Sequence, residues 1–364
     1  MKIRFLGNPE LQAMRLPMAL IGCLVTSAAL ACSTVALGPD EMTLVAYSYD
    51  TSATGAGFVV VNPAGANRTS IMEEEPAQWQ SAYGSITFNQ LGVGMPTAGM
   101  NTAGLAISLM WNDDAEFPPV ADRSVVNELE FIQFLLDRAG SVAEAISLVD
   151  EVGVQALVPI HYFIADATGN TAALTPTREG LAIQSGIDLP VRALTNSSYD
   201  HLVEGLAGFT GFGGHIPIPL ASKAVDPGSL ARFAITADAA QSREMISVGE
   251  AFDVLTSVEN PQTRWQIVFA PGDQMVHFRL ADQTAQHEID MSAVDFACHS
   301  VSLAANLTEL SEDRVNLTFQ PIEIGPLTDV LGQVLEGFVD ATGLSPEIAG
   351  PLASAQLGAV SCRF

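Results

Sequence analysis

Cysteines are the residues of this chain whose chemistry and spacing are most informative, and there are four of them, Cys23, Cys32, Cys298 and Cys362. A cysteine acts as a nucleophile only as its thiolate, and the free thiol has a pKa of about 8.5. Cys32 directly follows Ala29-Leu30-Ala31, where the two alanines suit the shallow pockets of a signal peptidase. Cleavage after Ala31 would make Cys32 the first residue of the mature chain.

The segment before Cys32 has the charge pattern of a signal peptide. Lys2, Arg4 and Arg15 precede an apolar run over residues 16–31. A transmembrane helix needs about 20 apolar residues, and this run is shorter. We therefore expect residues 1–31 to be removed during export. The mature chain is then predicted to be periplasmic or secreted, without stable membrane insertion.

A lipoprotein is the alternative interpretation of this segment. LIGC at 20–23 resembles a lipobox, which would make Cys23 a lipidated N-terminus. Cys32 could carry the lipid instead, although ALAC at 29–32 is a poor lipobox. The apolar run continues well past Cys23, which favours plain cleavage. The intact mass of the exported protein distinguishes an unmodified Cys32 terminus from a diacylglycerol adduct.

Loss of Cys23 with the signal peptide leaves an odd number of cysteines. In an oxidising compartment this predicts one disulfide and one free thiol. A bridge between Cys298 and Cys362 would tie down the C-terminal tail and contribute about 4 kcal/mol to stability. Cys32 is then the free thiol.

An N-terminal cysteine carries both a nucleophile and a base. The α-amino group titrates near pH 8, so a fair fraction of it is unprotonated at neutral pH. Thiol and amine lie at a fixed distance on one residue, which is the arrangement of N-terminal-nucleophile catalysis. A small buried cysteine at the start of a strand is the structural alternative for Cys32.

Other catalytic patterns are missing from the sequence. It has no G-x-S-x-G elbow, no Walker loop and no paired C-x-x-C, so any catalytic thiol is Cys32. We expect no metal and no cofactor, because none of the six histidines has metal-ligand spacing. The formal net charge of −26 and the lack of a basic patch exclude nucleic acid as a partner. The histidines are His161, His201, His215, His277, His287 and His299.

Blocks of strands alternate with blocks of helices along the chain. This pattern differs from the regular alternation of a parallel doubly wound sheet, and it predicts an α+β fold with antiparallel sheets covered by helices. Serine and glutamate at capping-box spacing open two of the helices, at Ser141 and Ser247. We expect strands at 33–37, 43–50, 57–63, 85–89, 104–111, 159–169, 171–177, 181–185 and 191–197, with a hairpin over 265–281. We expect helices at 124–138, 141–153, 199–207, 229–240 and 247–256.

From Cys32 to about residue 295 the chain resembles the choloylglycine hydrolase and penicillin V acylase family of N-terminal-nucleophile hydrolases, in its Gram-negative, signal-bearing branch. The resemblance implies a four-layer αββα sandwich. We expect three parts in the chain: the signal peptide at 1–31, a hydrolase domain of this kind at 32–302 and a C-terminal extension at 303–364 packed on that domain. The motifs that carry it are CST at 32–34, YSYD at 47–50, GMNTAGLAISLMW at 99–111, IHYFIADATG at 160–169, LTNSSYD at 194–200 and DPGSLARF at 226–233.

By this resemblance, four residues would be catalytic. Cys32 is the nucleophile and its amine the base, while Asp50 orients both groups. Asn196 donates its side-chain amide to the oxyanion, and Arg232 supports the nucleophile electrostatically. Asn101, in the family's GMN turn, has a structural role. From the residues alone, Asp50 could be a turn aspartate, Asn196 a buried strand-end asparagine and Arg232 a surface arginine.

Two further positions bear on activity and specificity. Tyr47 stands where the family usually has arginine, and a phenol supplies a hydrogen bond but no permanent charge for the thiolate. Trp111 stands where bile-salt hydrolases tend to have asparagine. Its backbone N–H would complete the oxyanion hole and its indole would wall an acyl pocket, unless it is simply a core residue.

The resemblance therefore implies hydrolysis of a small-molecule linear acyl amide through an acyl-Cys32 intermediate, with penicillin V or an N-acyl homoserine lactone as the substrate type. Bile-salt amides are the first alternative. An exported binding protein on the same fold, with its chemistry lost at Tyr47, is the second. The sequence leaves open whether the protein forms a homo-oligomer.

Overall fold

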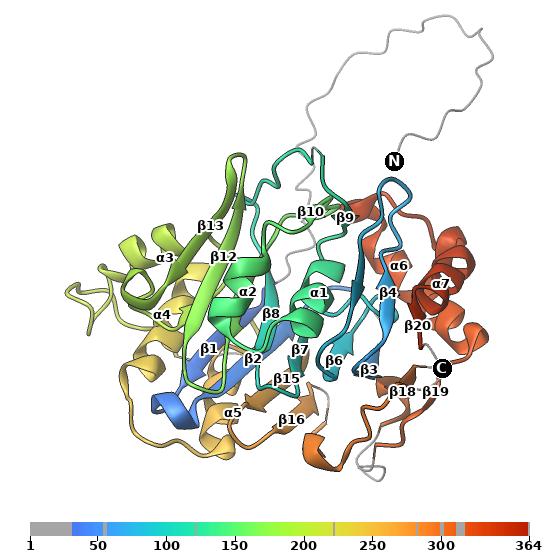
Figure 1. Cartoon of the computed structure of the whole chain (residues 1–364). Coiled ribbons are helices and arrows are strands. Elements are labelled where there is room, and N and C mark those ends of the chain that lie inside the picture. The colour runs from blue at the N-terminus through green and yellow to red at the C-terminus, as the bar shows by residue number, and fades with distance from the viewer. Residues whose placement is uncertain are drawn as a thin grey trace, which may run out of the picture.

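A computed structural model gives the architecture of the protein (Figure 1). The predicted signal peptide, apart from its last residue, lies outside the described residues, and so does His299. The structure describes residues 31–53, 57–120, 122–220, 223–281, 283–298, 302–310 and 317–362.

The first sheet has six strands in the order β14-β1-β2-β15-β16-β17, and every neighbouring pair is antiparallel. All residues of β1 and β2 are buried, as expected of short apolar strands covered on both faces. The strands are β1 (Ser33–Leu37), β2 (Leu44–Asp50), β14 (Ala193–Leu194), β15 (Thr263–Ala270), β16 (Met275–Leu280) and β17 (His287–Asp290).

The second sheet has nine strands in the order β13-β12-β11-β8-β7-β6-β3-β18-β19, again antiparallel throughout. Two small sheets flank it, β20-β4-β5 and the parallel pair β9-β10. The strands of the second sheet are β3 (Phe58–Asn62), β6 (Ser85–Asn89), β7 (Ala98–Asn101), β8 (Ala106–Trp111), β11 (Ile160–Ala165), β12 (Thr171–Thr177), β13 (Gly180–Ser185), β18 (Leu303–Asn306) and β19 (Gln320–Pro321). Those of the small sheets are β4 (Asn67–Thr69), β5 (Gln78–Gln80), β9 (Val125–Val126), β10 (Gly153–Val154) and β20 (Val360–Ser361).

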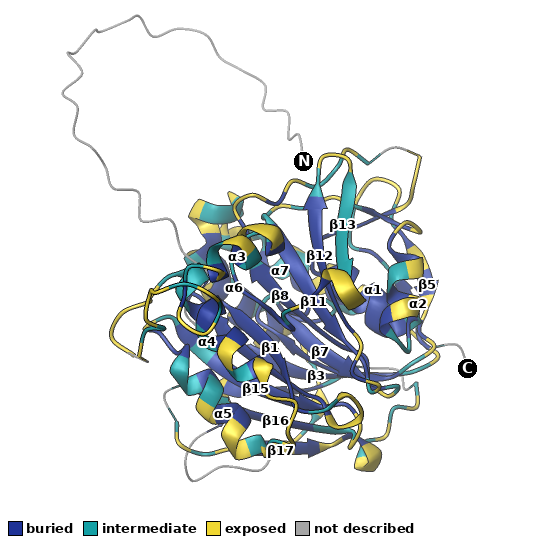
Figure 2. Ribbon diagram, turned by 90° about the vertical axis from the view of Figure 1, so that its left-hand side faces the viewer, coloured by how far each residue is buried: buried dark blue, intermediate teal, exposed yellow. Residues whose placement is uncertain are grey.

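Helices cover the outer face of each sheet. On the first sheet, α4 packs against β1 and β14, and α5 against β2 and β15, while α1 packs against β7 and β8 of the second sheet. The buried strands lie between helices whose outer surfaces are exposed (Figure 2), which gives the expected four-layer αββα sandwich. The helices are α1 (Glu130–Arg138), α2 (Val142–Leu148), α3 (Tyr199–Leu206), α4 (Ser229–Gln241), α5 (Val248–Ser257), α6 (Ile324–Thr342) and α7 (Ala349–Gly358).

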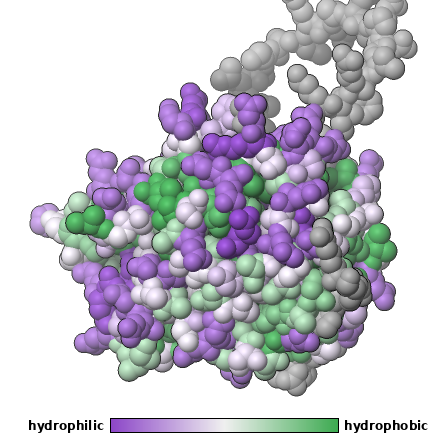
Figure 3. Space-filling view, viewed as in Figure 1, coloured by the Kyte–Doolittle hydropathy of each residue, from purple (hydrophilic) through white to green (hydrophobic). Residues whose placement is uncertain are grey.

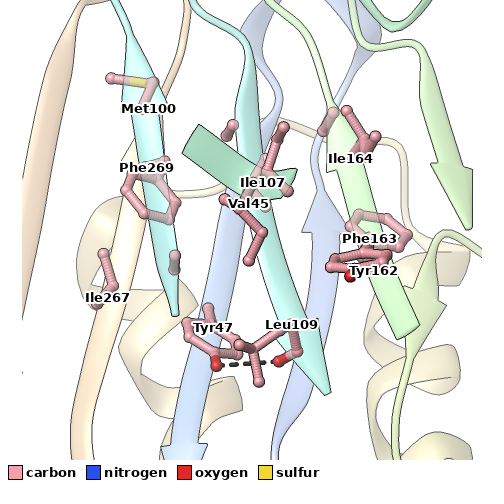
Figure 4. Close-up of a cluster of buried hydrophobic side chains, with 14 of the residues drawn as sticks. Val45, Tyr47, Met100, Ile107, Leu109, Tyr162, Phe163, Ile164, Ile267 and Phe269 are labelled. Atoms are coloured by element: carbon pink, nitrogen blue, oxygen red, sulfur yellow. Dashed lines mark hydrogen bonds between the residues drawn. The ribbon is translucent and has the colours of Figure 1, made fainter. Parts of the chain in front are cut away.

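The main core lies between the two sheets. Tyr47 of β2 and Phe269 of β15 face β7 and β8 across this interface, beside Ile107 and Leu109 (Figure 4). Phe88 of β6 packs edge-on against Phe269, with ring centroids 6.5 Å apart. The core therefore fixes the position of β2 against β8, and both strands lead into the candidate site.

The predicted helix at 124–138 is wrong at its start, because α1 begins at Glu130. Val125 and Val126 form β9 instead. The side-chain oxygen of Asn127 accepts from the backbone N–H of Leu129 and Glu130, while the Glu130 carboxylate accepts from the N–H of Asn127. Asn127 and Glu130 are thus a reciprocal cap at the true start of the helix, and the valines before it are free to pair as a strand.

The next predicted helix is shorter than expected, since α2 ends at Leu148 and Gly153 lies in β10. Ser141 caps it by accepting from the N–H of Glu144, but the Glu144 carboxylate accepts from Gly140 rather than from Ser141. The complete capping box forms at Ser247 and Glu250, at the start of α5.

The segment 303–364 contributes both strands and helices. Its strand β18 pairs with β3, and its helices α6 and α7 form a second apolar cluster over the outward side chains of β3, such as Phe58 and Val60. A disulfide joins Cys298 to Cys362, whose Cα atoms lie 5.5 Å apart, in agreement with the predicted pairing. Polar and apolar residues are interspersed over the face shown in Figure 3. None of the helices in the described ranges is long and apolar enough to cross a bilayer.

Candidate active site

Cys32 lies directly before β1 and is completely buried. The antiparallel pairing of β1 with β2 sets Ser33 opposite Ser48 and Thr34 opposite Tyr47. This register brings the end of β2 beside Cys32, so that the thiol donates a weak hydrogen bond to the backbone carbonyl of Asp50 at 3.7 Å. Within the described part of the chain, Cys32 is the free cysteine.

The surroundings keep the Cys32 thiol protonated. Burial and the negative charge of Asp50 raise the pKa of Cys32 to about 12, and the positive charge of Arg232 offsets only part of this. In the uncleaved chain the nitrogen of Cys32 is a peptide amide that follows Ala31. The base that N-terminal-nucleophile chemistry requires therefore does not exist before cleavage at that bond.

The hydroxyl of Tyr47 lies near the thiol of Cys32 but makes its better hydrogen bond to a backbone oxygen of β8. Its hydroxyl lies 3.0 Å from the backbone oxygen of Leu109 in β8 and 3.9 Å from Sγ of Cys32 (Figure 4 shows the first contact). A hydroxyl has one proton, and the shorter contact to oxygen is the better hydrogen bond. Tyr47 thus links the two sheets next to Cys32 and brings no charge to the thiol.

Asp50 ends β2 with its carboxyl group buried and hydrogen-bonded on both oxygens. The hydroxyl of Ser48 donates to Oδ1 at 2.7 Å, and the side-chain amide of Asn260 donates to Oδ2 at 2.7 Å. Burial raises the pKa of Asp50 to about 6, while the charge of Arg232 and these hydrogen bonds act in the opposite direction. The carboxyl group is therefore oriented and only moderately acidic.

Arg232 connects the parts of the site. It lies in the first turn of α4, 1% exposed, and its Nη1 donates to the carbonyl oxygen of Cys32 at 2.7 Å and to the hydroxyl of Ser33 at 2.8 Å. Its Nη2 donates to Oδ1 of Asn196 at 2.9 Å, and its Nε donates to Asp226 at 2.9 Å. One buried guanidinium thus fixes the nucleophile candidate and the oxyanion candidate together.

Asn196 and Trp111 meet at the edge of this group. Asn196 follows β14, and its side-chain Nδ2 donates to the backbone oxygen of Trp111 at 2.9 Å. Trp111 ends β8; its indole nitrogen donates to Asp113 at 2.6 Å, and the ring is partly buried against both apolar clusters. The backbone of Trp111 therefore lies beside Asn196, as an oxyanion hole made from the two would require.

The structure also assigns a role to Asn101. Its side-chain amide donates to the carbonyl oxygens of Leu136 and Ala139 at the end of α1, and its Oδ1 accepts from the N–H of Ala103 and Leu105. Asn101 therefore fixes the β7–β8 turn to α1, which is the structural role that we predicted for it.

Sequence reasoning missed the roles of four polar residues of the site: Ser33, Ser48, Asp226 and Asn260. Asp226 lies in the DPGSLARF motif, six positions before Arg232, so its pairing could have been proposed. Asn260 lies 210 positions from Asp50 in a turn before β15, and no local pattern connects the two. In the described residues there is no group of three or more histidine, cysteine or acidic side chains able to hold a metal.

Comparison with known proteins identifies the family to which the chain belongs. The model of the family of linear amide C–N hydrolases, choloylglycine hydrolase family, matches residues 32–268, which is well over half of the chain. The chain belongs to this family and is thus a hydrolase of linear amide carbon–nitrogen bonds, of the acylase and bile-salt hydrolase type.

Individual relatives are distant. Penicillin V acylase of Pectobacterium atrosepticum is 21% identical over 269 residues, which cover 62% of this chain and 71% of the relative. The structure of penicillin V acylase from Agrobacterium tumefaciens superposes with a TM-score of 0.67 and 20% identity, covering 80% of this chain and 98% of the other. A variant of conjugated bile acid hydrolase from Clostridium perfringens gives a TM-score of 0.62 at 17% identity, covering 78% and 100% of the two chains.

Proposed function

We propose that the protein is an exported N-terminal-nucleophile amidohydrolase that cleaves acyl amides through an acyl-Cys32 intermediate. The observation that carries this proposal is the position of Arg232, which hydrogen-bonds the carbonyl oxygen of Cys32 and Oδ1 of Asn196 with one guanidinium. This contact brings the predicted nucleophile and the predicted oxyanion donor together across 164 positions of the chain.

Cleavage after Ala31 would switch the site on. It converts the Cys32 amide into a free amine, the base that takes the thiol proton. The new ammonium group would also add a positive charge beside the thiol, which favours the thiolate. The pKa of about 12 for Cys32 describes the uncleaved chain, so the precursor is inert by this reasoning.

The first half of the reaction forms a thioester. The sulfur of Cys32 attacks the amide carbon while the α-amine takes the thiol proton, and the oxygen becomes an oxyanion that accepts hydrogen bonds from Asn196 and the backbone N–H of Trp111. The carbon–nitrogen bond then breaks, and the α-amine passes its proton to the leaving nitrogen. Asp50 orients the amine throughout.

The second half releases the acid. The amine takes a proton from water, the hydroxide attacks the thioester carbon and the carbon–sulfur bond breaks. The proton returns to sulfur, so Cys32 and its amine end in their starting states. No metal or cofactor enters either half.

For substrates, we propose penicillin V or N-acyl homoserine lactones. The relatives named as penicillin V acylases support the first. The formal charge of −26 favours neutral lactones over anionic substrates, among which are both penicillin V and the bile-salt amides. The partly buried indole of Trp111 is suited to an aromatic or fatty acyl wall. Conjugated bile salts are the alternative, supported by the structural neighbour that acts on conjugated bile acids.

Turnover by the exported, mature protein tests the proposal. Its mass should begin at unmodified Cys32, and it should hydrolyse penicillin V or a long-chain acyl homoserine lactone faster than glycocholate. A Cys32→Ser variant should lose the activity, and the uncleaved precursor should lack it. Activity that survives the Cys32→Ser change refutes the nucleophile. Ligand binding without turnover of any acyl amide would favour the binding-protein alternative.

A further inference from the structure

A cavity lies at the other end of β1 from Cys32. It has a volume of about 410 Å³, within the range of small-molecule binding sites. Arg192 and Asp40 line this cavity. The carbonyl oxygen of Arg192 accepts a hydrogen bond from the N–H of Ala36 in β1, and Asp40 lies just beyond β1. At about 3.3 Å per strand residue, Ala36 lies roughly 13 Å along the strand from Cys32, so this cavity is separate from the candidate active site.

The cavity has an apolar side and a cationic side. Val142 and Ile146 of α2 and Leu189 after β13 line the apolar side. The cationic side has Arg192 and Arg243, with one carboxylate in the lining, that of Asp40. Two guanidinium groups against one carboxylate leave the lining with a net positive charge, in a protein whose formal charge is −26.

Arg192 is a buried cation with unused hydrogen-bonding capacity. Its side chain is 5% exposed, and its Nη2 donates to the carbonyl oxygen of Gly38 at 2.6 Å. Its Nη1 has only long contacts, 3.4 Å to the hydroxyl of Thr43 and 3.7 Å to Asp40, and its Nε has no hydrogen-bond partner. A buried arginine this weakly neutralised is costly unless an anion compensates it.

Arg243 is more exposed than Arg192 and makes the closer ion pair with Asp40. It is 54% exposed and binds Oδ1 of Asp40 at 2.8 Å, against 3.7 Å from the same oxygen to Arg192. Burial and the charge of Arg243 lower the pKa of Arg192 to about 10, which reflects the same shortage of negative charge.

A close backbone contact holds the cationic side of the cavity in place. Gly169, in the turn between β11 and β12, has a φ of +80°, and a Cβ there would lie 2.5 Å from the Cα and carbonyl oxygen of Asp40. Only glycine permits this approach of the two loops. The backbone of Asp40 is therefore held against the turn between β11 and β12.

We propose that this arginine cavity binds a small carboxylate with an apolar body. The carboxylate would accept from the open N–H groups of Arg192 and Arg243, and the apolar body would lie against Val142, Ile146 and Leu189. The inference does not depend on the proposed function, because it uses no residue of the candidate active site.

Calorimetric titration of the mature Cys32→Ser protein with octanoate tests the proposal, because this variant cannot hydrolyse the amide used as a control. Octanamide, which lacks the charge, and inorganic phosphate, which lacks the apolar body, should each bind at least tenfold more weakly. In Arg243→Gln, octanoate affinity should fall about tenfold, the usual effect of one charge-assisted hydrogen bond. The matched control is Arg123→Gln, since Arg123 is similarly exposed at 48% and pairs with a single aspartate outside the cavity. It should bind octanoate like the unaltered protein.

The outcomes separate this site from others. Equal octanoate affinity in Arg243→Gln and Arg123→Gln would place the ligand elsewhere and overturn the proposal, as would the absence of binding at millimolar octanoate. If octanamide bound as tightly as octanoate, the arginines would have no role in binding. If phosphate bound as tightly as octanoate, the apolar side of the cavity would have no role in binding. Arg192→Gln should weaken binding further; if it fails to fold, Arg243→Gln still decides.

Discussion

Arg232 offers the sharpest test of how the site is built, because it makes four hydrogen bonds and one of them fixes Asn196. A lysine keeps the charge but has one nitrogen in place of three, so Arg232→Lys cannot hold Cys32, Asn196 and Asp226 together. If Asn196 is an oxyanion donor, its loss in Asn196→Ala lowers kcat/KM by about 10² to 10³. Misplacing it through Arg232→Lys should have an effect of the same order.

The double variant decides whether the two residues act as one unit. Independent effects would multiply to about 10⁴ to 10⁶, whereas full dependence would leave the double variant no worse than Asn196→Ala. Arg232 also holds the carbonyl oxygen of Cys32, so part of its effect should remain. We expect the double variant to be at least tenfold more active than the product of the single effects predicts, a coupling of about 1.4 kcal/mol.

The assay is kcat/KM of the mature variants for the acyl amide that is turned over fastest, normalised to the folded fraction by circular dichroism. Arg264→Lys is the control, because Arg264 donates to the carbonyl oxygens of Thr51 and Ser52 and not to the site; its activity should stay within about threefold of the unaltered protein. Single effects that multiply within experimental error would refute the view that Arg232 acts through Asn196.

Three further predictions concern ionisation and stability. Asn260→Leu removes a hydrogen-bond donor to Asp50, so the pKa of Asp50 should rise above about 6. The activity of this variant relative to the unaltered protein should therefore be lower at pH 6.5 than at pH 8.5. A relative activity that is the same at both pH values would contradict this. Burial raises the pKa of Glu128 from 4.5 to about 7, so its contribution to stability is full below pH 4.5 and is lost as pH rises through 7. Glu128→Gln should therefore gain about 3 kcal/mol relative to the unaltered protein between pH 4 and 8 in urea unfolding, and parallel pH curves would refute the assignment. Replacing Cys298 and Cys362 by serine opens a loop of 64 positions and should cost about 4 kcal/mol in the same assay, while added reductant should leave that variant unchanged.

The strands of the candidate site could be predicted because their signals are local. Val35 to Leu37 and Val45 to Tyr49 lie in short apolar runs bounded by turn residues, and both form buried strands close to the expected bounds. The start of α1 could not be placed from apolar periodicity, since Val125 and Val126 fit the periodicity of the helix as well as they fit a strand. The cap at Asn127 is a polar signal that this periodicity does not contain.

Contacts between distant segments were beyond local reasoning. Asn260 reaches Asp50 because β15 pairs with β2, and the arginine cavity needs Asp40, Arg192 and Arg243 from three separate segments. Each of these side chains is unremarkable in its own sequence context. The antiparallel order of the first sheet and the packing of α4 on β1 and β14 bring them together, and no single segment encodes either.

Because residue 47 is a neutral tyrosine, the positive charge that would activate the thiol must be sought at Arg232. The Tyr47 hydroxyl is bonded to Leu109 and is neutral, so it cannot stabilise a thiolate by charge. Arg232 is the cation that lowers the pKa of Cys32, and it does so from the carbonyl side of the residue, through Nη1 at 2.7 Å from the carbonyl oxygen. The guanidinium nitrogens of Arg232 donate to oxygen atoms of Cys32, Ser33, Asn196 and Asp226 rather than to Sγ. We therefore expect further positive charge for the thiolate to come from the α-ammonium group that cleavage after Ala31 would create. The proposed acyl-Cys32 mechanism thus depends on one measurable quantity, the pKa of Cys32 after the proposed cleavage, which must fall far below about 12 if Cys32 is to attack an amide.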